Sequence, residues 1–216
     1  MPDKKLRAKQ ETYWKTTASS YDRSISAVDK RFLAGSRVWA CRRASGKTLE
    51  VAIGTGLNLD FYPSGIKLFG LEFSRPMMEG ALTKSSHMNL DVTYTQGDAL
   101  ALPYSDASFD SVLCTYALCG FQDERAALVE MRRVLKPGGR LMLADHVVSS
   151  NFLVQALQWL LELYSLPAHG EHFRRRPLLL LESLGFEILE TERLSFGVIE
   201  RVHARKKLNT NTTVSE

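Results

Sequence analysis

The sequence predicts an α/β fold built on a doubly wound, seven-stranded sheet that is mostly parallel and ends in an antiparallel hairpin. Strand and helix patterns alternate between residues 48 and 148, which is typical of a parallel sheet covered by helices on both faces. Strand segments such as SVLCT and LMLA are almost continuously apolar, as expected for buried parallel strands. The last two strand patterns, 186–194 and 196–205, are nearly adjacent in the chain. They must be antiparallel, because a parallel return needs a crossover of about a dozen residues or more.

The other elements follow from the same periodicities. In the first forty-odd residues, Val28, Phe32 and Trp39 indicate an amphipathic helix that we expect to end near Ser45 and Gly46. The remaining strands are predicted at 48–53, 67–72, 92–96, 109–115 and 140–148. Helices are predicted at 57–61, 75–84, 123–135, 151–166 and 177–184, with Pro137-Gly138-Gly139 ending the third of them.

Composition and charge narrow the class of protein. The net charge is +4, with basic runs in 4–9, 174–176 and 201–207. We interpret these runs as solvated surface or as a peripheral contact with an anionic membrane, and expect no nucleic-acid partner because aromatic residues do not alternate with the charges. The charged N-terminus and the lack of an apolar run of about 18 residues predict a cytoplasmic protein. Three cysteines without metal-ligand spacing predict reduced thiols and no metal site.

Two glycines follow the first strand, in the segment LEVAIGTGLNLD. This turn lies at the switch point of a doubly wound sheet, where ligands bind, and Gly54 and Gly56 allow a ligand to lie against the backbone. A dinucleotide fingerprint would require a third glycine where Leu59 stands, which argues against a pyrophosphate. Glu72, at the end of the second strand, still suits the hydroxyls of a ribose. The ligand that remains is a nucleoside with a short polar arm.

Four motifs occur in order at regular spacing: EVAIGTG, LFGLEFS, GDAL followed by LPYSDASFDSVLCTYAL, and EMRRVLKPGGRLMLADH. Together they resemble the class I S-adenosylmethionine-dependent methyltransferases, whose fold is Rossmann-like, and they cover roughly residues 48–148. Within that family the chain looks similar to the small-molecule and lipid branch, which includes ubiquinone/menaquinone C-methyltransferases, phosphatidylethanolamine N-methyltransferases and small thiol S-methyltransferases. The family's usual first glycine is Ala52 here, from which we expect a slightly altered fit and retained cofactor binding.

The resemblance also implies a domain organisation. One methyltransferase domain would span residues 1–216. It would consist of an N-terminal helical cap (1–46), a cofactor-binding core (47–148), acceptor-side helices with the terminal hairpin (149–206) and a frayed tail (207–216).

The resemblance implies S-adenosylmethionine as cofactor and gives roles to the motif residues. Glu50 would orient the loop and assist the methionyl amine, while Gly54 and Gly56 would pass beneath the methionine and ribose. Glu72 would accept hydrogen bonds from both ribose hydroxyls, and Asp98 would accept one from the adenine amino group. The remaining implied contacts are the Ala99 amide on the adenine ring, Phe73 and Leu100 on its two faces, Cys114, Thr115 and Tyr116 beside the methionine arm, and Ala52 and Asn58 in the glycine-rich loop.

Tyr21 is either an aromatic that closes over the cofactor or an ordinary core residue. Methyl transfer from a sulfonium depends mainly on alignment and desolvation, so a general base is needed only for an acceptor that arrives protonated. His146, directly after the fifth strand, is the candidate catalytic residue, and a structural hydrogen-bonding role is the alternative. His169 and His172 are further candidates.

The segment 151–167 is apolar almost all round, so we expect it to be buried, to pack against an apolar ligand or to form a dimer face. The resemblance then implies a small, apolar or amphipathic, lipid-like acceptor, methylated on an O, N, S or C atom that the sequence does not identify. One alternative is a nucleic-acid methyltransferase, but CTYA stands where such amine modifiers carry an Asn/Asp-Pro-Pro-aromatic run. The other is a non-catalytic cofactor-binding module of the same fold.

Overall fold

Seven strands form one sheet in the order β3-β2-β1-β4-β5-β7-β6. The computed structural model describes residues 3–88 and 90–208. Strands β1 to β5 pair in parallel, whereas β7 is antiparallel to both β5 and β6. The strands are β1 Lys47–Val51, β2 Lys67–Glu72, β3 Val92–Gln96, β4 Phe109–Thr115, β5 Leu135–His146, β6 Phe186–Leu194 and β7 Ile199–Lys206. The predicted Rossmann-like sheet with its terminal antiparallel hairpin is confirmed.

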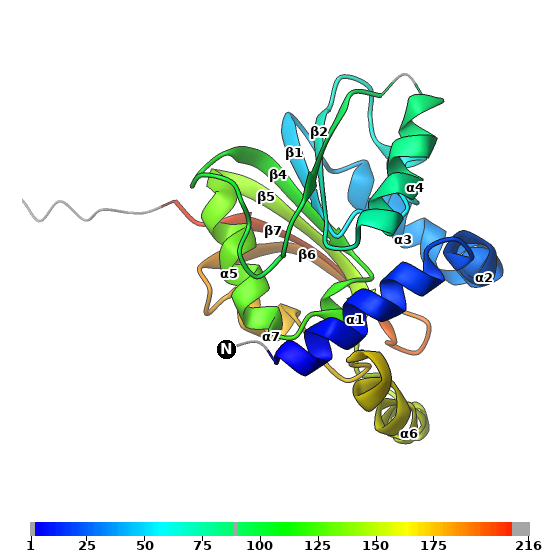
Figure 1. Cartoon of the computed structure of the whole chain (residues 1–216). Helices are drawn as coiled ribbons and strands as arrows, with labels where there is room; N and C mark the ends of the chain where they lie inside the picture. The colour runs from blue at the N-terminus through cyan, green and yellow to red at the C-terminus, as the bar shows by residue number, and fades with distance from the viewer. Residues whose placement is uncertain (1–2, 89, 209–216) are drawn as a thin grey trace, which may run out of the picture.

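Helices cover both faces of this sheet, with α3 and α4 on one side and α5 and α7 on the other (Figure 1). The helices are α1 Lys4–Thr17, α2 Tyr21–Val28, α3 Ala34–Cys41, α4 Arg75–Ser86, α5 Glu124–Val134, α6 Phe152–His169 and α7 Leu178–Leu181. A π-helical turn, η1 Asp29–Leu33, joins α2 to α3, and short 3-10 turns lie at η2 Leu59–Phe61 and η3 Leu118–Gly120.

Successive residues of the central strands contribute to different hydrophobic clusters. Val112 and Leu141 belong to the cluster that includes residues of α5 and α7, and Leu113 and Met142 belong to the cluster that includes residues of α3. All four are fully buried. Because side chains alternate across a strand, a nearly continuous apolar sequence is what a sheet covered on both faces requires.

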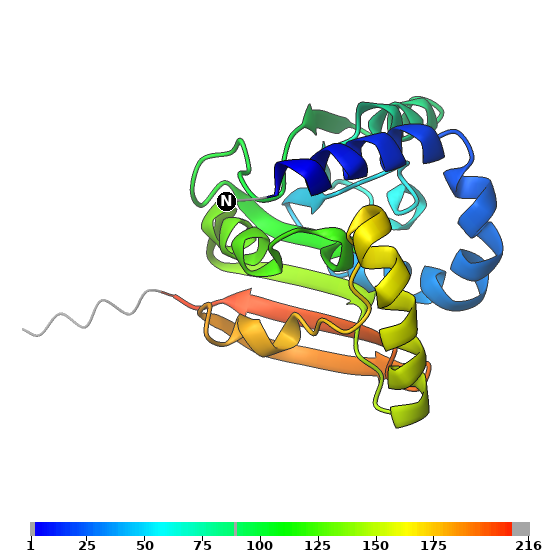
Figure 2. The same ribbon diagram turned by 60° about the horizontal axis from the view of Figure 1, so that its bottom comes forward.

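The chain runs from β1 through β2 to β3 on one side of the sheet and through β4 to β5 on the other, so the switch point lies between β1 and β4. The loops after these strands share one edge of the sheet. Helices α1 and α2 lie over that edge, and the C-terminal end of α6 meets α1 there (Figure 2).

The predicted helices 57–61 and 177–184 are shorter in the structure, as η2 and α7, and the last strand starts at Ile199 instead of residue 196. Three further differences are larger. The N-terminal region is broken into α1, α2, η1 and α3 rather than forming one long amphipathic helix, and Val28 and Phe32 are about half exposed. The Pro-Gly-Gly sequence lies inside β5, because α5 has already ended at Val134. Between the paired positions Phe109–Leu135 and Ser111–Arg140, β5 has more residues than β4 and forms a bulge, with Gly138 at a φ of +75°.

The third difference is α6, whose apolar side chains are largely exposed instead of buried. None of the helices within 3–88 and 90–208 is long and apolar enough to cross a membrane. The proposed division into cap, core, acceptor side and tail remains a prediction, and residues 209–216 of the tail lie outside the described residues.

Candidate cofactor and acceptor site

A cavity of about 490 Å³ lies at the carboxyl ends of the parallel strands. One wall is formed by the loops after β1, β2, β3 and β4 together with His146, and the opposite wall by α1 and α2. Of the predicted site residues, those that line the cavity are Tyr21, Ala52, Gly54, Glu72, Phe73, Asp98, Ala99, Leu100, Thr115, Tyr116 and His146. Four others, Glu50, Gly56, Asn58 and Cys114, are not among its lining residues.

The loop after β1 uses its small residues for different purposes. Ala52, Gly54 and Gly56 all have positive φ, at 58°, 59° and 80°. A Cβ on Gly56 would lie 2.6 Å from Leu59 Cδ1 and 3.1 Å from the Cα of Ala81, so this glycine allows α4 to pack closely. A Cβ on Gly54 would have room, and Gly54 faces the cavity. Ala52 thus has the left-handed backbone conformation, which the family's usual glycine would adopt without strain.

Glu72 is held rigidly at the end of β2. One of its carboxylate oxygens accepts a hydrogen bond from the Gly54 N–H at 2.9 Å, and the other accepts one from the Ser74 N–H at 2.9 Å. Burial raises the pKa of Glu72, and these backbone hydrogen bonds oppose the rise. The carboxyl group therefore ties the ends of β1 and β2 together at the cavity wall.

Asp98 already has a cationic partner. The Arg7 guanidinium of α1 donates to Asp98 Oδ2 at 2.7 Å and lies 5.0 Å from the centre of the Phe73 ring. The other Asp98 oxygen accepts from the Leu100 N–H. A planar group with N–H donors thus occupies the niche between Phe73 and Asp98, which the sequence assigned to adenine. Sequence reasoning missed Arg7 because it placed this basic run on the solvated surface.

Glu50 belongs to a buried polar network beneath the cavity. It accepts hydrogen bonds from Asn58 Nδ2 at 2.8 Å and from the Tyr62 hydroxyl at 2.7 Å. Burial raises the pKa of Glu50 to about 7, although both hydrogen bonds oppose this shift. Asn58 Nδ2 also donates to Thr115 Oγ1. Glu50 is therefore connected to the loop after β1 through Asn58 and does not line the cavity, and its predicted role toward the methionyl amine stays a prediction.

Arg37 of α3 is the buried cation of this network. Its Nε donates to Asp29 Oδ1 at 2.7 Å, and its Nη1 donates to Asn58 Oδ1 and Thr115 Oγ1 at 3.2 and 3.1 Å. Its guanidinium also lies 4.9 Å from the centre of the Tyr116 ring. No sequence motif marks Arg37, because a single arginine in an otherwise ordinary helix carries no periodic signal.

The residues after β4 divide between core and cavity. Cys114 is fully buried within the hydrophobic core, whereas Thr115 and Tyr116 line the cavity. Tyr116 has a φ of +53° and donates from its hydroxyl to the Leu33 carbonyl oxygen at 3.3 Å. The turn after β4 is thereby attached to the start of α3.

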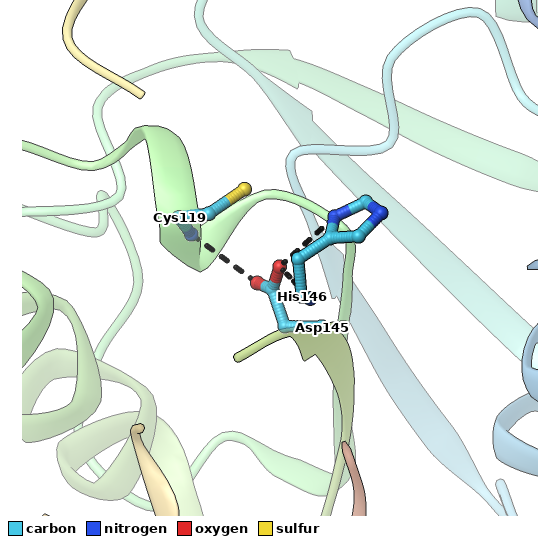
Figure 3. A group of neighbouring side chains, drawn as sticks. All are labelled: Cys119, Asp145 and His146. Carbon is cyan, nitrogen blue, oxygen red and sulfur yellow. Dashed lines mark hydrogen bonds and ion pairs between the residues drawn. The ribbon is translucent and has the colours of Figure 1, made fainter. Parts of the chain in front are cut away.

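His146 stands beside Asp145 and Cys119 at the end of β5 (Figure 3). Asp145 accepts hydrogen bonds from the backbone N–H groups of His146 at 2.7 Å and Cys119 at 3.3 Å. The Nδ1 atom of His146 lies 3.9 Å from Asp145 Oδ1 and is buried without a hydrogen-bond partner among the described residues. Burial and the Arg37 charge lower the pKa of His146 to about 4, so its imidazole is neutral near pH 7.

The ligand atoms of Cys119, Asp145 and His146 lie within 4.8 Å of one another, close enough to surround a metal ion. Burial and the nearby Asp145 raise the pKa of the Cys119 thiol well above its ordinary value, which disfavours the thiolate that a metal would bind. Burial likewise raises the pKa of Asp145 to about 6. Cys119 and His146 line the cavity, and the buried Asp145 accepts hydrogen bonds from the backbone N–H groups of both.

The opposite wall is rich in aromatic side chains. Tyr21 packs edge-on against Trp14, and burial raises its pKa to about 12. Tyr13 packs edge-on against His169, whose Nε2 lies 3.5 Å from Glu171 Oε2. All five of these residues line the cavity. His172 does not line it, and its backbone N–H donates to the Cys119 carbonyl oxygen.

Comparison with known proteins agrees with this arrangement. The family described as "Methyltransferase domain" matches residues 49–143. A solved S-adenosylmethionine-dependent methyltransferase from Thermotoga maritima is 26% identical and aligns with a TM-score of 0.68 over 90% of this chain and 98% of its own. Residues 49–143 therefore match a methyltransferase-domain family, and the whole fold is similar to that of an S-adenosylmethionine-dependent methyltransferase.

Two curated methyltransferases are similar to the chain over shorter stretches. A demethylmenaquinone methyltransferase of Deinococcus radiodurans is 34% identical over 66% of this chain and 61% of its own length. A thiol S-methyltransferase of Homo sapiens is 41% identical over 48% of this chain and 45% of its own length. The matches thus span about half to three fifths of these relatives.

The left-handed conformation of Ala52 predicts that Ala52→Gly stabilises the protein by about 1 kcal/mol, because glycine adopts this φ without strain. Urea unfolding followed by circular dichroism would measure the change. Ala107→Gly is the matched control, since Ala107 also has a positive φ, of 51°, but is exposed and lies outside the cavity lining. A loss of stability in Ala52→Gly would contradict this interpretation of the loop.

The buried position of Arg37 predicts that Arg37→Met lowers the free energy of unfolding by about 3 kcal/mol or more, because it leaves Asp29 buried without its cation. Adding Asp29→Asn should recover part of the loss. Arg205→Met, which removes a half-exposed pair with Glu187, should cost less than about 1 kcal/mol. Equal effects of Arg37→Met and Arg205→Met in urea unfolding would show that the network carries little stability.

Proposed function

We propose that the chain transfers a methyl group from S-adenosylmethionine to a small, apolar or aromatic acceptor bound beneath α1 and α2. The observation that carries the proposal is the pair of carboxylates, Glu72 and Asp98, at the ends of adjacent strands in one cavity with Phe73. The proposal is supported by the match of residues 49–143 to the methyltransferase-domain family and by the aromatic wall of the cavity. It is also supported by the names of two relatives, a demethylmenaquinone methyltransferase and a thiol S-methyltransferase.

The residues present fit such a cofactor. Arg7 stacks its flat guanidinium on Phe73 and donates to Asp98, so this niche accepts a planar group that carries N–H donors. An adenine amino edge has the same shape and donor chemistry. Glu72, at the end of the neighbouring strand β2, offers acceptor oxygens to ribose hydroxyls. Arg7 must leave Asp98, at least in part, before adenine can take its place.

The bound cofactor would supply a methyl group on a cationic sulfur, and the chain's own part is to align the acceptor and exclude water. Tyr13, Trp14 and Tyr21 cover the cavity from the side opposite the strand ends. These rings favour an apolar acceptor over a strongly hydrated one.

The histidine at the end of β5 is better suited to positioning than to proton removal. With its pKa lowered to about 4, neutral His146 is a weak base, but its ring lines the cavity and can contact an acceptor there. The pKa of Glu171 is raised by burial, and Glu171 lies beside His169 in the same cavity. We propose that Glu171 takes the proton of an acceptor such as a thiol or phenol, while His146 orients it.

Calorimetry with S-adenosylhomocysteine tests the cofactor site. Glu72→Ala and Asp98→Ala should each weaken binding by at least about tenfold, because each removes a charged acceptor. Arg7→Ala should tighten binding by roughly three- to tenfold, because it frees Asp98. Glu79→Ala, an exposed carboxylate on the neighbouring α4, is the control and should leave the affinity unchanged. Unchanged affinity in both Glu72→Ala and Asp98→Ala would remove this site assignment.

Incubation with labelled S-adenosylmethionine tests the reaction itself. The acceptors should be matched pairs of thiols, phenols, amines and quinols that share the reacting atom and differ in apolar size. We expect the more apolar member of at least one pair to be methylated faster. Cofactor binding without turnover on any acceptor would instead indicate a non-catalytic module, and salt-sensitive methylation of RNA would indicate a nucleic-acid enzyme.

A further inference from the structure

Helix α6 has its polar and apolar faces reversed relative to a helix that packs on a core. Its fully buried residues are Gln158, Glu162 and Ser165, which are spaced by four and three positions and so share one narrow face. Its exposed residues include large apolar side chains that are between 47% and 77% accessible: Phe152, Leu153, Leu157, Trp159, Leu160, Leu161, Leu163 and Tyr164. The broad apolar face, defined by these eight residues, points away from the protein.

The inward polar face holds the helix firmly in this orientation. Gln158 donates from Nε2 to the carbonyl oxygens of Val147 and Phe173 and accepts from the Ser149 N–H. Glu162 accepts from the Phe173 N–H at 2.7 Å and pairs with Arg174 at 2.5 Å. Rotating α6 so that its apolar face points inward would break all of these hydrogen bonds and leave the polar groups without these partners. The exposure of the apolar face is therefore built into the fold.

The apolar face extends beyond α6 at its N-terminal end. Phe196, in the turn between β6 and β7, is 78% exposed, and its carbonyl oxygen accepts hydrogen bonds from Ser149 Oγ at 2.7 Å and from the Ser150 N–H at 3.1 Å. These serines directly precede Asn151, the N-cap of α6. A contiguous exposed surface made of this many large apolar side chains is typical of an interaction site.

Basic side chains border the C-terminal end of the same face. Glu162 is the only Asp, Glu, Lys or Arg in α6, and it is turned inward and paired. Lys9 of α1 is exposed and donates from Nζ to the Pro167 carbonyl oxygen at 2.9 Å. Lys5, one helical turn earlier, lies on the same side of α1 and is also exposed. The positions of α1 and α6 relative to each other are visible in Figure 2.

We propose that the apolar face of α6, together with Phe196, docks on the surface of an anionic phospholipid membrane. Helices that lie in the plane of a membrane interface combine a broad apolar face with flanking cations, and Trp and Tyr suit the headgroup region. Lys5 and Lys9 provide charge complementarity to anionic headgroups. A two-fold dimer through the same face fits less well, because α6 offers Lys5 and Lys9 of a second copy no outward-facing carboxylate: its single acidic residue, Glu162, is turned inward and paired.

The proposed docking also suits the proposed function. His169, the last residue of α6, lines the cavity, so docking would bring that side of the cavity close to the lipid phase. An apolar acceptor dissolved in the membrane would then have a short route to the site. This consequence rests on the proposed function, whereas the docking itself does not.

Vesicle co-sedimentation of the full chain tests the docking without any assay of activity. The wild-type protein should bind vesicles of phosphatidylglycerol and phosphatidylcholine more tightly than vesicles of phosphatidylcholine alone. Leu157→Glu/Leu160→Glu should weaken binding to both by at least about tenfold, because it places charges on the apolar face. Lys5→Glu/Lys9→Glu should remove most of the preference for anionic lipid. Leu82→Glu, on the distant α4, is the control and should bind like the wild type.

All substituted positions are exposed, and circular dichroism with urea unfolding would verify that each variant folds. Absence of vesicle binding by the folded wild type would overturn the proposal. So would a concentration-dependent dimer in sedimentation velocity that Leu157→Glu/Leu160→Glu abolishes while vesicle binding stays unchanged. S-adenosylhomocysteine binding by the same samples separates failure of docking from failure of the cofactor site.

Discussion

The buried guanidinium of Arg37 connects the helical cover to the edge of the sheet that lines the cavity. It joins Asp29 in the π-helical turn, Asn58 after β1 and Thr115 at the end of β4. Asn58 in turn donates to Glu50, so the network crosses the switch point of the sheet. A buried cation is tolerated only where its hydrogen bonds are satisfied, which fixes the positions of these loops together. The π-helical turn places Asp29 within reach of Arg37 and is part of the same constraint.

The two carboxylates that line the cavity above this network already have partners within the chain. Glu72 is held by two backbone N–H groups, and Asp98 is neutralised by Arg7. The two carboxylates therefore differ in what a ligand must displace: Glu72 keeps its backbone hydrogen bonds, whereas Asp98 must exchange a cation for a neutral donor. If the cofactor binds as proposed, its ribose would meet the preorganised Glu72, whereas its adenine would have to displace Arg7 from Asp98.

Much of the sheet was predictable because its signals are local. The predicted bounds of β2, β3, β4 and β6 agree with the structure, since each strand is bounded by turn residues and its side-chain pattern is unambiguous. The motif residues were brought to one edge because the family's topology places them there. Gly56 and Cys114 are in the motifs yet serve packing, which only the positions of Leu59, Ala81 and the core reveal.

What the sequence did not reveal depends on contacts between distant segments. Arg7 reaches Asp98 across 91 positions, and Arg37 reaches Thr115 across 78. The orientation of α6 was expected to follow its apolar majority, but the helix is anchored by Gln158 and Glu162. Those two residues and Ser165 do form a helical face in the sequence, so the polar stripe was visible, whereas its burial was not.

Helix α1 carries Arg7 and Lys9 only two residues apart, one against Asp98 and the other against the end of α6. If α1 shifts as a rigid segment when Arg7 leaves Asp98, the contact between Lys9 and Pro167 changes as well. The proposed binding of adenine beside Asp98 and the proposed docking of the outer face of α6 would then be thermodynamically coupled through the position of α1. By reciprocity, each of the two binding events would then change the affinity of the other by the same factor.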